Sequence, residues 1–339
     1  MSSICTLPFG PDAPWLAPLA GYSDLPFRML CRKYGAACSE TEMVSVKGLL
    51  YGGFGSERLL TTIEHDTPLV VQLFGAEPDN FQRVMPGLLE RGFTHFDLNC
   101  GCSVRKVTKS GSGVQLMSKP GVLCSIVKEM IDAAGPGRVG VKLRLGLQQG
   151  EENFLDLGRR LADLGVGWLT LHPRTGKQLF SGEAAWSCIA ELVQAVPVPV
   201  LASGDLYTAE DAARCLRQTG AAGVMFARGA LTDPMIFSRL RDLLAGRDSG
   251  PRTADSLAEA ASAHITFARD LDGSTKAFRC LRSFLPRYAK GFAGIRSLRQ
   301  RLTACRNWEE LLNEAQSIST LAELAPGTVA EETDLFPLE

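Results

Sequence analysis

The sequence predicts an α/β protein of the (β/α)8 TIM-barrel class, followed by a C-terminal all-helical domain. Between residues 15 and 245, eight short apolar runs alternate with amphipathic helical stretches. Eight parallel strands joined by helices are the number that closes a barrel. A doubly wound sheet is the alternative, but no GxGxxG fingerprint follows the first run, which disfavours its dinucleotide-binding form.

The predicted elements follow from apolar periodicity and from capping signals. The strands are expected at residues 15–20, 36–39, 68–74, 94–98, 139–145, 168–171, 199–202 and 223–227. The intervening helices are expected at residues 78–91, 121–134, 152–164, 184–193, 209–219 and 233–244. Thr208 and Asp233 precede two of these helices and are predicted to cap them.

The composition changes near residue 245 and divides the chain into three parts. Residues 1–245 form the predicted catalytic barrel, and residues 246–252 resemble a linker. Residues 253–320 form the predicted helical domain, with helices at 256–271, 276–289, 295–304 and 308–315. Residues 326–339 are acidic, contain few helix signals and are expected to be a flexible tail.

Bulk composition restricts the class of protein. The chain has 339 residues, a formal net charge of -1 and 45% hydrophobic residues, which is typical of a soluble globular protein. No apolar run approaches the roughly 20 residues that span a bilayer. The first residues lack a basic n-region and an apolar h-region, so we do not expect secretion. Its ten cysteines are irregularly spaced without a CxxC pair, so we expect no disulfide framework, no metal site and a cytoplasmic location.

The ends of the predicted strands carry polar residues or glycine, and in a barrel all these ends meet at one open face. Reading them in order gives 17–21, Glu40, Gln72, Asn99, Lys142, Arg144, 172–174, 203–205 and 228–229. Core packing alone does not explain so many polar strand ends. The pattern therefore predicts a ligand-binding mouth.

One strand end is especially rich in chemistry. The segment 97–113 places Cys102 among small residues and ahead of three cations, Arg105, Lys106 and Lys109. This arrangement fits a thiol that faces an anionic ligand. It also fits a small packed cysteine beside a solvated loop, because free cysteine is among the most buried residue types.

The other strand ends favour a flavin mononucleotide (FMN) site. Gly204, Arg228 and Gly229 lie at the last two strands, where barrels commonly bind phosphate. The amides of Gln72 and Asn99 suit the edge of a heteroaromatic ring, and Lys142 suits negative charge developing on it. A sugar phosphate or another phosphorylated metabolite is the competing ligand. A reduced flavin acting on a carbon–carbon double bond also needs a proton donor, which Cys102 can provide.

Between residues 276 and 306 there are nine Lys or Arg residues and no acidic residue. Aromatic residues interleave with them, namely Phe278, Phe284, Tyr288 and Phe292. A charge run is commonly a solvated face, but bases with aromatics also suit a surface that binds nucleic-acid phosphates.

The residues then resemble a known family, the bacterial tRNA-dihydrouridine synthases. The resemblance covers about residues 14 to 305 and is carried by ordered motifs. They are Leu16-Ala-Pro-Leu-Ala-Gly-Tyr-Ser-Asp24, Val71-Gln-Leu-Phe-Gly75, Asp97-Leu-Asn-Cys-Gly-Cys102, Val141-Lys-Leu-Arg-Leu-Gly146, Leu171-His-Pro-Arg-Thr175, Ala202-Ser-Gly-Asp205, Ala227-Arg-Gly-Ala230 and Leu285-Pro-Arg-Tyr-Ala-Lys-Gly-Phe-Ala-Gly-Ile-Arg296. Each motif is weak alone, whereas the ordered set is specific.

The resemblance implies an FMN-containing TIM barrel whose helical domain helps to bind tRNA. It implies NADPH-dependent reduction of the C5–C6 double bond of a D-loop uridine, with flavin N5 as hydride donor to C6 and Cys102 as acid at C5. The implied cofactor contacts are Ala17, Pro18, Leu19, Gln72, Lys142, His172, Ser203, Gly204, Asp205, Arg228 and Gly229. The implied substrate contacts are Asn99, Arg105, Lys106, Arg174, Arg282, Arg287, Tyr288, Lys290 and Arg296. A monomer is expected.

Three positions depart from the family pattern. Ser103 stands where proline usually follows the cysteine, Thr108 replaces a common asparagine, and Ser203 replaces the asparagine before Gly-Asp. Two other functions stay open: a tRNA-binding protein that modifies poorly or not at all, and a flavin reductase of a free pyrimidine. The basic helices argue against the second.

Overall fold

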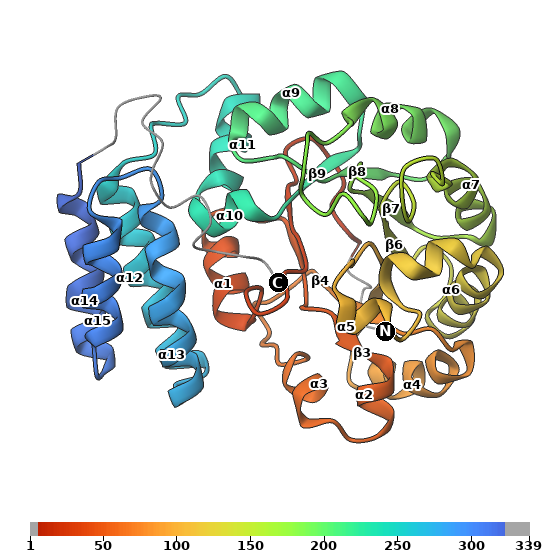
Figure 1. Ribbon diagram of the computed structural model, residues 1–339, viewed down its shortest axis with the longest axis horizontal. Helices are drawn as coiled ribbons and strands as arrows, with labels where there is room; N and C mark the ends of the chain where they lie inside the picture. The colour runs from red at the N-terminus through yellow and green to blue at the C-terminus, as the bar shows by residue number, and fades with distance from the viewer. Residues whose placement is uncertain (1–5, 323–339) are drawn as a thin grey trace.

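The computed structural model describes residues 6–322, and its sheet is a closed parallel barrel (Figure 1). The barrel strands are β1 (Trp15–Leu16), β2 (Cys38–Glu40), β4 (Leu69–Phe74), β5 (His95–Cys100), β6 (Val139–Leu143), β7 (Trp168–Leu171), β8 (Val200–Ala202) and β9 (Gly223–Phe226). The ring closes because β1 pairs with both β2 and β9. The short β3 (Val44–Ser45) pairs beside β4. The predicted fold class is confirmed.

Helices surround the barrel and continue beyond it. In chain order they are α1 (Leu25–Lys33), α2 (Val46–Leu50), α3 (Phe54–Arg58), α4 (Pro78–Glu90), α5 (Arg105–Thr108), η1 (Gly113–Ser118), α6 (Pro120–Ala134), α7 (Phe154–Leu164), α8 (Trp186–Ala195), α9 (Ala209–Thr219), α10 (Arg228–Thr232) and α11 (Ile236–Leu244). The C-terminal region contains α12 (Ala254–Leu271), α13 (Thr275–Phe284), η2 (Leu285–Ala289), α14 (Ile295–Ala304), α15 (Trp308–Gln316) and η3 (Ser317–Thr320). The expected acidic tail, 326–339, lies outside the described residues.

Local chemistry explains where elements differ from the sequence prediction. Thr208 caps α9 as predicted, since its side chain accepts the Asp211 N–H in a capping box. Asp233 does not cap a helix directly, because α11 begins only at Ile236; the Asp233 carboxylate instead accepts the Met235 N–H at 3.0 Å. The single helix predicted over 276–289 is wrong. It divides at residue 285, and Pro286, which has no N–H to donate, lies in the following η2.

Large side chains fill the amino-terminal half of the barrel interior. The indole rings of Trp15 and Trp168 lie 5.7 Å apart, and Phe9 stacks on Trp15 at 5.3 Å. Gly140 leaves the room that Trp168 occupies, since a Cβ at this glycine would lie 2.0 Å from the indole. The polar side chains of Gln72 in β4 and Lys142 in β6 stand nearer to the carboxyl ends of their strands than this aromatic layer. In β6, Lys142 follows Gly140 by two residues. The packed aromatic layer therefore forms the floor beneath the polar mouth.

The C-terminal helices form a bundle on one side of the barrel, next to α1 (Figure 1). The ring of His264 in α12 lies 5.4 Å from that of Phe27 in α1 and 4.9 Å from that of Phe284 in α13. Burial lowers the pKa of His264 to about 3, so its imidazole is neutral at this apolar contact. Within residues 6–322, no helix combines the length and the apolarity that a membrane span requires.

We predict that Gly140→Ala destabilises the barrel by about 1–3 kcal/mol, the usual cost of overpacking a core. The new methyl group would overlap the Trp168 indole. Chemical unfolding with urea measures this change. Gly87→Ala on the exposed face of α4 is the control and should be neutral or slightly stabilising, because nothing lies within 4 Å of its Cβ. Equal stability of the two variants would contradict this account of the barrel floor.

Candidate active site

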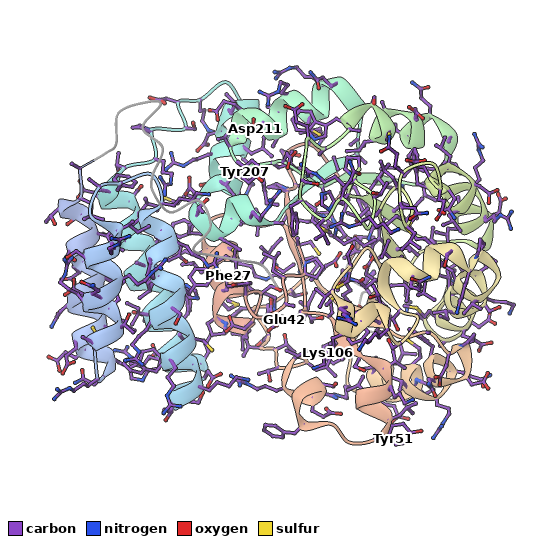
Figure 2. The ribbon with its side chains drawn as sticks, in the orientation of Figure 1. Phe27, Glu42, Tyr51, Lys106, Tyr207 and Asp211 are labelled. Carbon is purple, nitrogen blue, oxygen red and sulfur yellow. The ribbon has the colours of Figure 1, made fainter. Side chains whose placement is uncertain are left out.

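A cavity of about 690 Å³ opens at the carboxyl end of the barrel strands. Most residues predicted for the mouth line it: Ala17, Pro18, Leu19, Asn99, Cys102, Arg105, Lys142, His172, Ser203, Gly204, Asp205 and Arg228. Tyr207 follows β8 and borders the cavity, whereas Lys106 in α5 stays exposed outside it; both are labelled in Figure 2. The structure therefore gathers residues from β1 to β9 into one site.

Other predicted residues do not line this cavity, among them Glu40. Gln72 is fully buried inside the barrel and donates its amide hydrogens to Glu40 and Asp97. Gly229 packs against the Leu206 carbonyl, which would lie 2.5 Å from a Cβ at that position. Arg174 is 1% exposed and lies beneath Asp205. In this structure these residues belong to the wall and floor of the cavity, and their predicted cofactor and substrate contacts stay predictions.

The Cys102 loop is fixed by hydrogen bonds at both ends. The Asn99 side-chain oxygen accepts the Cys102 N–H at 2.9 Å, and the Cys102 carbonyl accepts the Val114 N–H at 2.9 Å. Gly113 has a φ of 64°, and a Cβ there would lie 2.4 Å from the Cys102 oxygen. Glycine is therefore required at the point where the chain returns beneath the thiol.

The environment of Cys102 keeps its side chain protonated. Burial raises the pKa of the thiol, while the Val104 backbone and the cations Arg144 and Lys142 oppose this rise. Burial prevails, so the thiol is the dominant form at neutral pH. The cations that act on the thiol, Lys142 and Arg144, come from β6 and its end.

Burial determines the protonation state of His172, and the cations at the mouth act in the same direction. Burial, followed by Arg144 and Lys142, lowers the pKa of His172 well below its ordinary value, so the imidazole is neutral. Burial likewise lowers the pKa of Lys142 and takes that of Arg144 to about 10. Arg144 holds the loop by donating to the Gly101 carbonyl at 2.8 Å. Among these groups, Cys102 is the one that carries a transferable proton at neutral pH without being a cation.

Asp205 organises the opposite wall of the cavity. It adopts a left-handed φ of 54° and pairs with Arg174 at 2.6 Å and Arg228 at 3.1 Å. Burial would raise the pKa of Asp205, but hydrogen bonds from Arg174 and Ala184 outweigh it and lower the pKa. Arg228 is also flanked by two aromatic rings, with Phe180 at 4.5 Å and Tyr207 at 5.0 Å. Its guanidinium is held ready for an anionic ligand.

Sequence reasoning missed several lining residues. Tyr22, Met43, Phe180 and Tyr207 lie in loops after strands, where no periodic pattern marks them. Arg144 was recognised as a strand-end residue but was given no role. Its position two residues after Lys142 was the available signal, because both side chains then lie on the same side of the chain.

The basic C-terminal residues divide into an exposed set and a structural set. Lys290 and Arg296 are exposed. Arg282 donates to the Thr303 and Cys305 carbonyls, both at 2.7 Å, and therefore joins α13 to the end of α14. Tyr288 is fully buried, and its hydroxyl forms a hydrogen bond of 2.9 Å with the His264 ring. Its side chain is therefore not exposed on the surface of the bundle.

A second hollow of about 470 Å³ lies between the barrel and the C-terminal helices. Gly21, Tyr22 and Asp24 line it from the barrel, and Arg287, Arg299 and Thr303 line it from the helices. Tyr22 also lines the barrel cavity. Its hydroxyl accepts from Arg287 at 2.6 Å, and the guanidinium lies 4.6 Å from its ring centre. One side chain thus borders both hollows.

A comparison with protein families decides the relationship. The family model described as Dihydrouridine synthase (Dus) matches residues 15–323, which include every barrel strand and the helices α12–α15. The chain belongs to the dihydrouridine synthase family. Within residues 6–322, no cluster of His, Cys, Asp or Glu could hold a metal ion.

Relatives match over most of their lengths. A probable tRNA-dihydrouridine synthase 1 of Synechocystis is 36% identical, over 90% of this chain and 86% of its own. A probable tRNA-dihydrouridine synthase of Treponema pallidum is also 36% identical, over 83% and 85%. An old yellow enzyme homologue from Zymomonas mobilis is 15% identical with a TM-score of 0.46, covering 69% of this chain and 88% of its own.

The structure locates the three departures from the dihydrouridine synthase pattern. The Ser103 hydroxyl makes only a long 3.5 Å contact with the Gly101 carbonyl, so it replaces proline without a strong new restraint. Thr108 bonds back to Val104 and Arg105 within α5. Ser203 lines the cavity. None of the three alters the contacts that hold the Cys102 backbone.

We predict that Cys102 reacts slowly with iodoacetamide at neutral pH. Its alkylation rate should rise only at a higher pH than the alkylation rate of an ordinary cysteine. Thiolate is the reactive form, and burial raises the pKa of this thiol. Peptide mass spectrometry follows the reaction, with the exposed Cys280 as internal reference.

Lys142→Met should shift the Cys102 profile to still higher pH, because the variant loses a cation that favours thiolate. Lys109→Met is the matched control, since it removes a loop cation that does not determine this pKa. Alkylation of Cys102 as fast as that of Cys280 at pH 7 would contradict the assignment.

Proposed function

We propose that this chain reduces the C5–C6 double bond of a D-loop uridine in tRNA to 5,6-dihydrouridine, using FMN and NADPH. The observation that carries this proposal is the protonated thiol of Cys102, held beside Lys142 at the cavity of a dihydrouridine synthase barrel. The names of the Synechocystis and Treponema relatives support the choice of tRNA.

The residues present fit FMN. The cavity lies within the roughly 300–1,000 Å³ that small-ligand sites occupy. Gly204 has a φ of 108° and lies so close to His172 that a Cβ would be 2.7 Å from the ring, so the backbone can approach a ligand closely. We assign Arg228 and Gly204 to the phosphate, and Lys142 and the neutral His172 to the ring system. Lys142 favours negative charge there.

Cys102 serves as the acid in this proposal. Bound FMN would supply the hydride chemistry: once reduced by NADPH, it would deliver hydride to C6 of the uracil. The Cys102 thiol donates its proton to C5. The resulting thiolate is stabilised by Lys142 and Arg144, the same cations that oppose the raised pKa of the thiol. Cys102 therefore holds its proton before the reaction, and Lys142 and Arg144 favour the release of that proton during the reaction.

The C-terminal helices are assigned to the tRNA. Their exposed cations include Lys276, Arg279, Lys290 and Arg296, and Tyr22 lines both the hollow beside these helices and the barrel cavity. Phosphate contacts give affinity, while the base must leave the helical stack to reach the flavin. Tyr22 borders both hollows, so we place the path of the uridine along its ring.

Cys102→Ala should abolish dihydrouridine formation while flavin stays bound and is still reduced by NADPH. Flavin absorbance measures binding and reduction, and mass spectrometry of tRNA measures the product. Cys124→Ala, which removes a half-buried thiol on α6 that lines neither hollow, is the control and should retain activity. Full activity of Cys102→Ala would refute the acid assignment. A wild-type protein that binds FMN and tRNA but forms no product with NADPH would instead be a binding protein.

Arg279→Ala and Lys290→Ala should each weaken tRNA binding and reduce the salt slope of log K by about 1, as expected for one lost phosphate contact. Lys128→Ala on α6, which removes an ion-paired surface lysine, should change neither. Binding titrations at several salt concentrations test this. Unchanged slopes for both basic-helix variants would place the RNA elsewhere.

The proposal also places the reduced uridine in the D-loop of the tRNA. Sequencing tRNA from cells lacking this gene identifies the position at which dihydrouridine is lost. Loss outside the D-loop would contradict the proposed target while leaving the reaction itself intact.

A further inference from the structure

A chain of buried polar side chains crosses neighbouring barrel strands below the cavity. It consists of Glu40 in β2, Gln72 in β4, and Asp97 and Asn99 in β5. Glu40, Gln72 and Asp97 have no exposed surface, and Asn99 is 5% exposed. Buried polar groups are costly unless they bond to one another, so a connected set of this kind has a specific geometry.

The two carboxyl groups determine how the Gln72 amide is turned. Its Nε2 donates to Glu40 Oε2 at 3.1 Å and to Asp97 Oδ2 at 2.7 Å, which uses both amide hydrogens. Its Oε1 must then face Asn99, whose Nδ2 donates to it at 2.8 Å. A flipped Gln72 would place an oxygen against two carboxyl oxygens and lose all three bonds.

The orientation of the Gln72 amide also determines the orientation of the Asn99 amide, which contacts the Cys102 loop. Because Asn99 Nδ2 faces Gln72, its Oδ1 faces the chain that follows β5. This oxygen accepts the backbone N–H of Cys102 at 2.9 Å and of Gly101 at 3.3 Å. The orientation set by two carboxyl groups in the barrel interior therefore reaches the backbone of the thiol.

Protonation of the carboxyl groups does not break this chain. Burial raises the pKa of both Glu40 and Asp97, while Gln72 and Lys142 oppose it. Glu40 Oε1 and Asp97 Oδ1 have no hydrogen-bond partner within the described part of the chain. A proton can reside on either of these oxygens while the oxygens that face Gln72 remain acceptors.

We propose that Glu40 and Asp97 are positioning residues, which act through the Gln72 and Asn99 amides to hold the Cys102 backbone in place for proton transfer. The proposal rests on the proposed function only in taking Cys102 as the acid. It assigns neither carboxyl group a contact with substrate or flavin.

The test compares Asp97→Leu, which removes the acceptor, with Asp97→Asn, which keeps an acceptor oxygen. The first readout is hydrogen exchange of the Cys102 amide in the FMN-bound protein. Exchange should be faster in Asp97→Leu and near wild type in Asp97→Asn. Ser39→Ala, a buried β2 change outside the chain, is the control and should leave exchange unchanged.

The second readout separates the two half-reactions of the flavin. In Asp97→Leu, reoxidation of reduced flavin by tRNA should slow by about 100-fold, the cost of a small misplacement of a reacting group. Reduction by NADPH should change little, and Asp97→Asn should restore most of the lost rate. If Asp97→Leu does not fold, Gln72→Met interrupts the same chain and should show the same pattern.

The outcomes separate this proposal from the proposed function. Unchanged exchange and unchanged reoxidation by tRNA in Asp97→Leu and Gln72→Met would overturn the positioning role. Equal slowing of both half-reactions would also overturn it, because a general loss of structure would then explain the effect. Faster Cys102 exchange together with a fully active Cys102→Ala would keep the positioning role and remove the acid assignment.

Discussion

Closure of the parallel sheet is the constraint on which the other features depend. Because β1 pairs with both β2 and β9, the carboxyl ends of all the barrel strands form one ring. Trp15 and Trp168 fill the interior below this ring, and Gly140 gives Trp168 its space. The polar side chains of Gln72, Asp97 and Lys142 stand above this aromatic layer, where they support the cavity.

The electrostatics of the cavity follow from its position at the carboxyl ends of the strands, where its side chains are partly shielded from water. Lys142, Arg144 and Arg228 converge on a partly desolvated space, where charges act more strongly on one another than in water. His172 is driven to its neutral form, and Cys102 keeps its proton because burial outweighs the cations. A single arrangement thus combines a positive potential with an uncharged thiol, which are the two properties that the proposed function requires of this cavity.

The fold and most of the mouth could be predicted because both depend on local patterns. Apolar runs marked the strands, and polar strand ends marked Cys102, Lys142 and His172. The buried positions of Gln72 and Tyr288 could not be predicted. Neither the period of apolar residues nor the residue type shows whether a side chain faces a cavity or a buried partner. Loop residues such as Phe180 were missed because their location depends on the path of the chain between strands.

The contact between Tyr22 and Arg287 limits how this architecture can vary during evolution. The barrel and the helical bundle are not independent modules, because the tyrosine beside the catalytic cavity is held by an arginine from the bundle. A bundle exchanged with that of a relative would need to carry an equivalent partner for this ring. Under the proposed function, changes in RNA preference are therefore expected to arise by substitutions within the existing bundle rather than by its replacement.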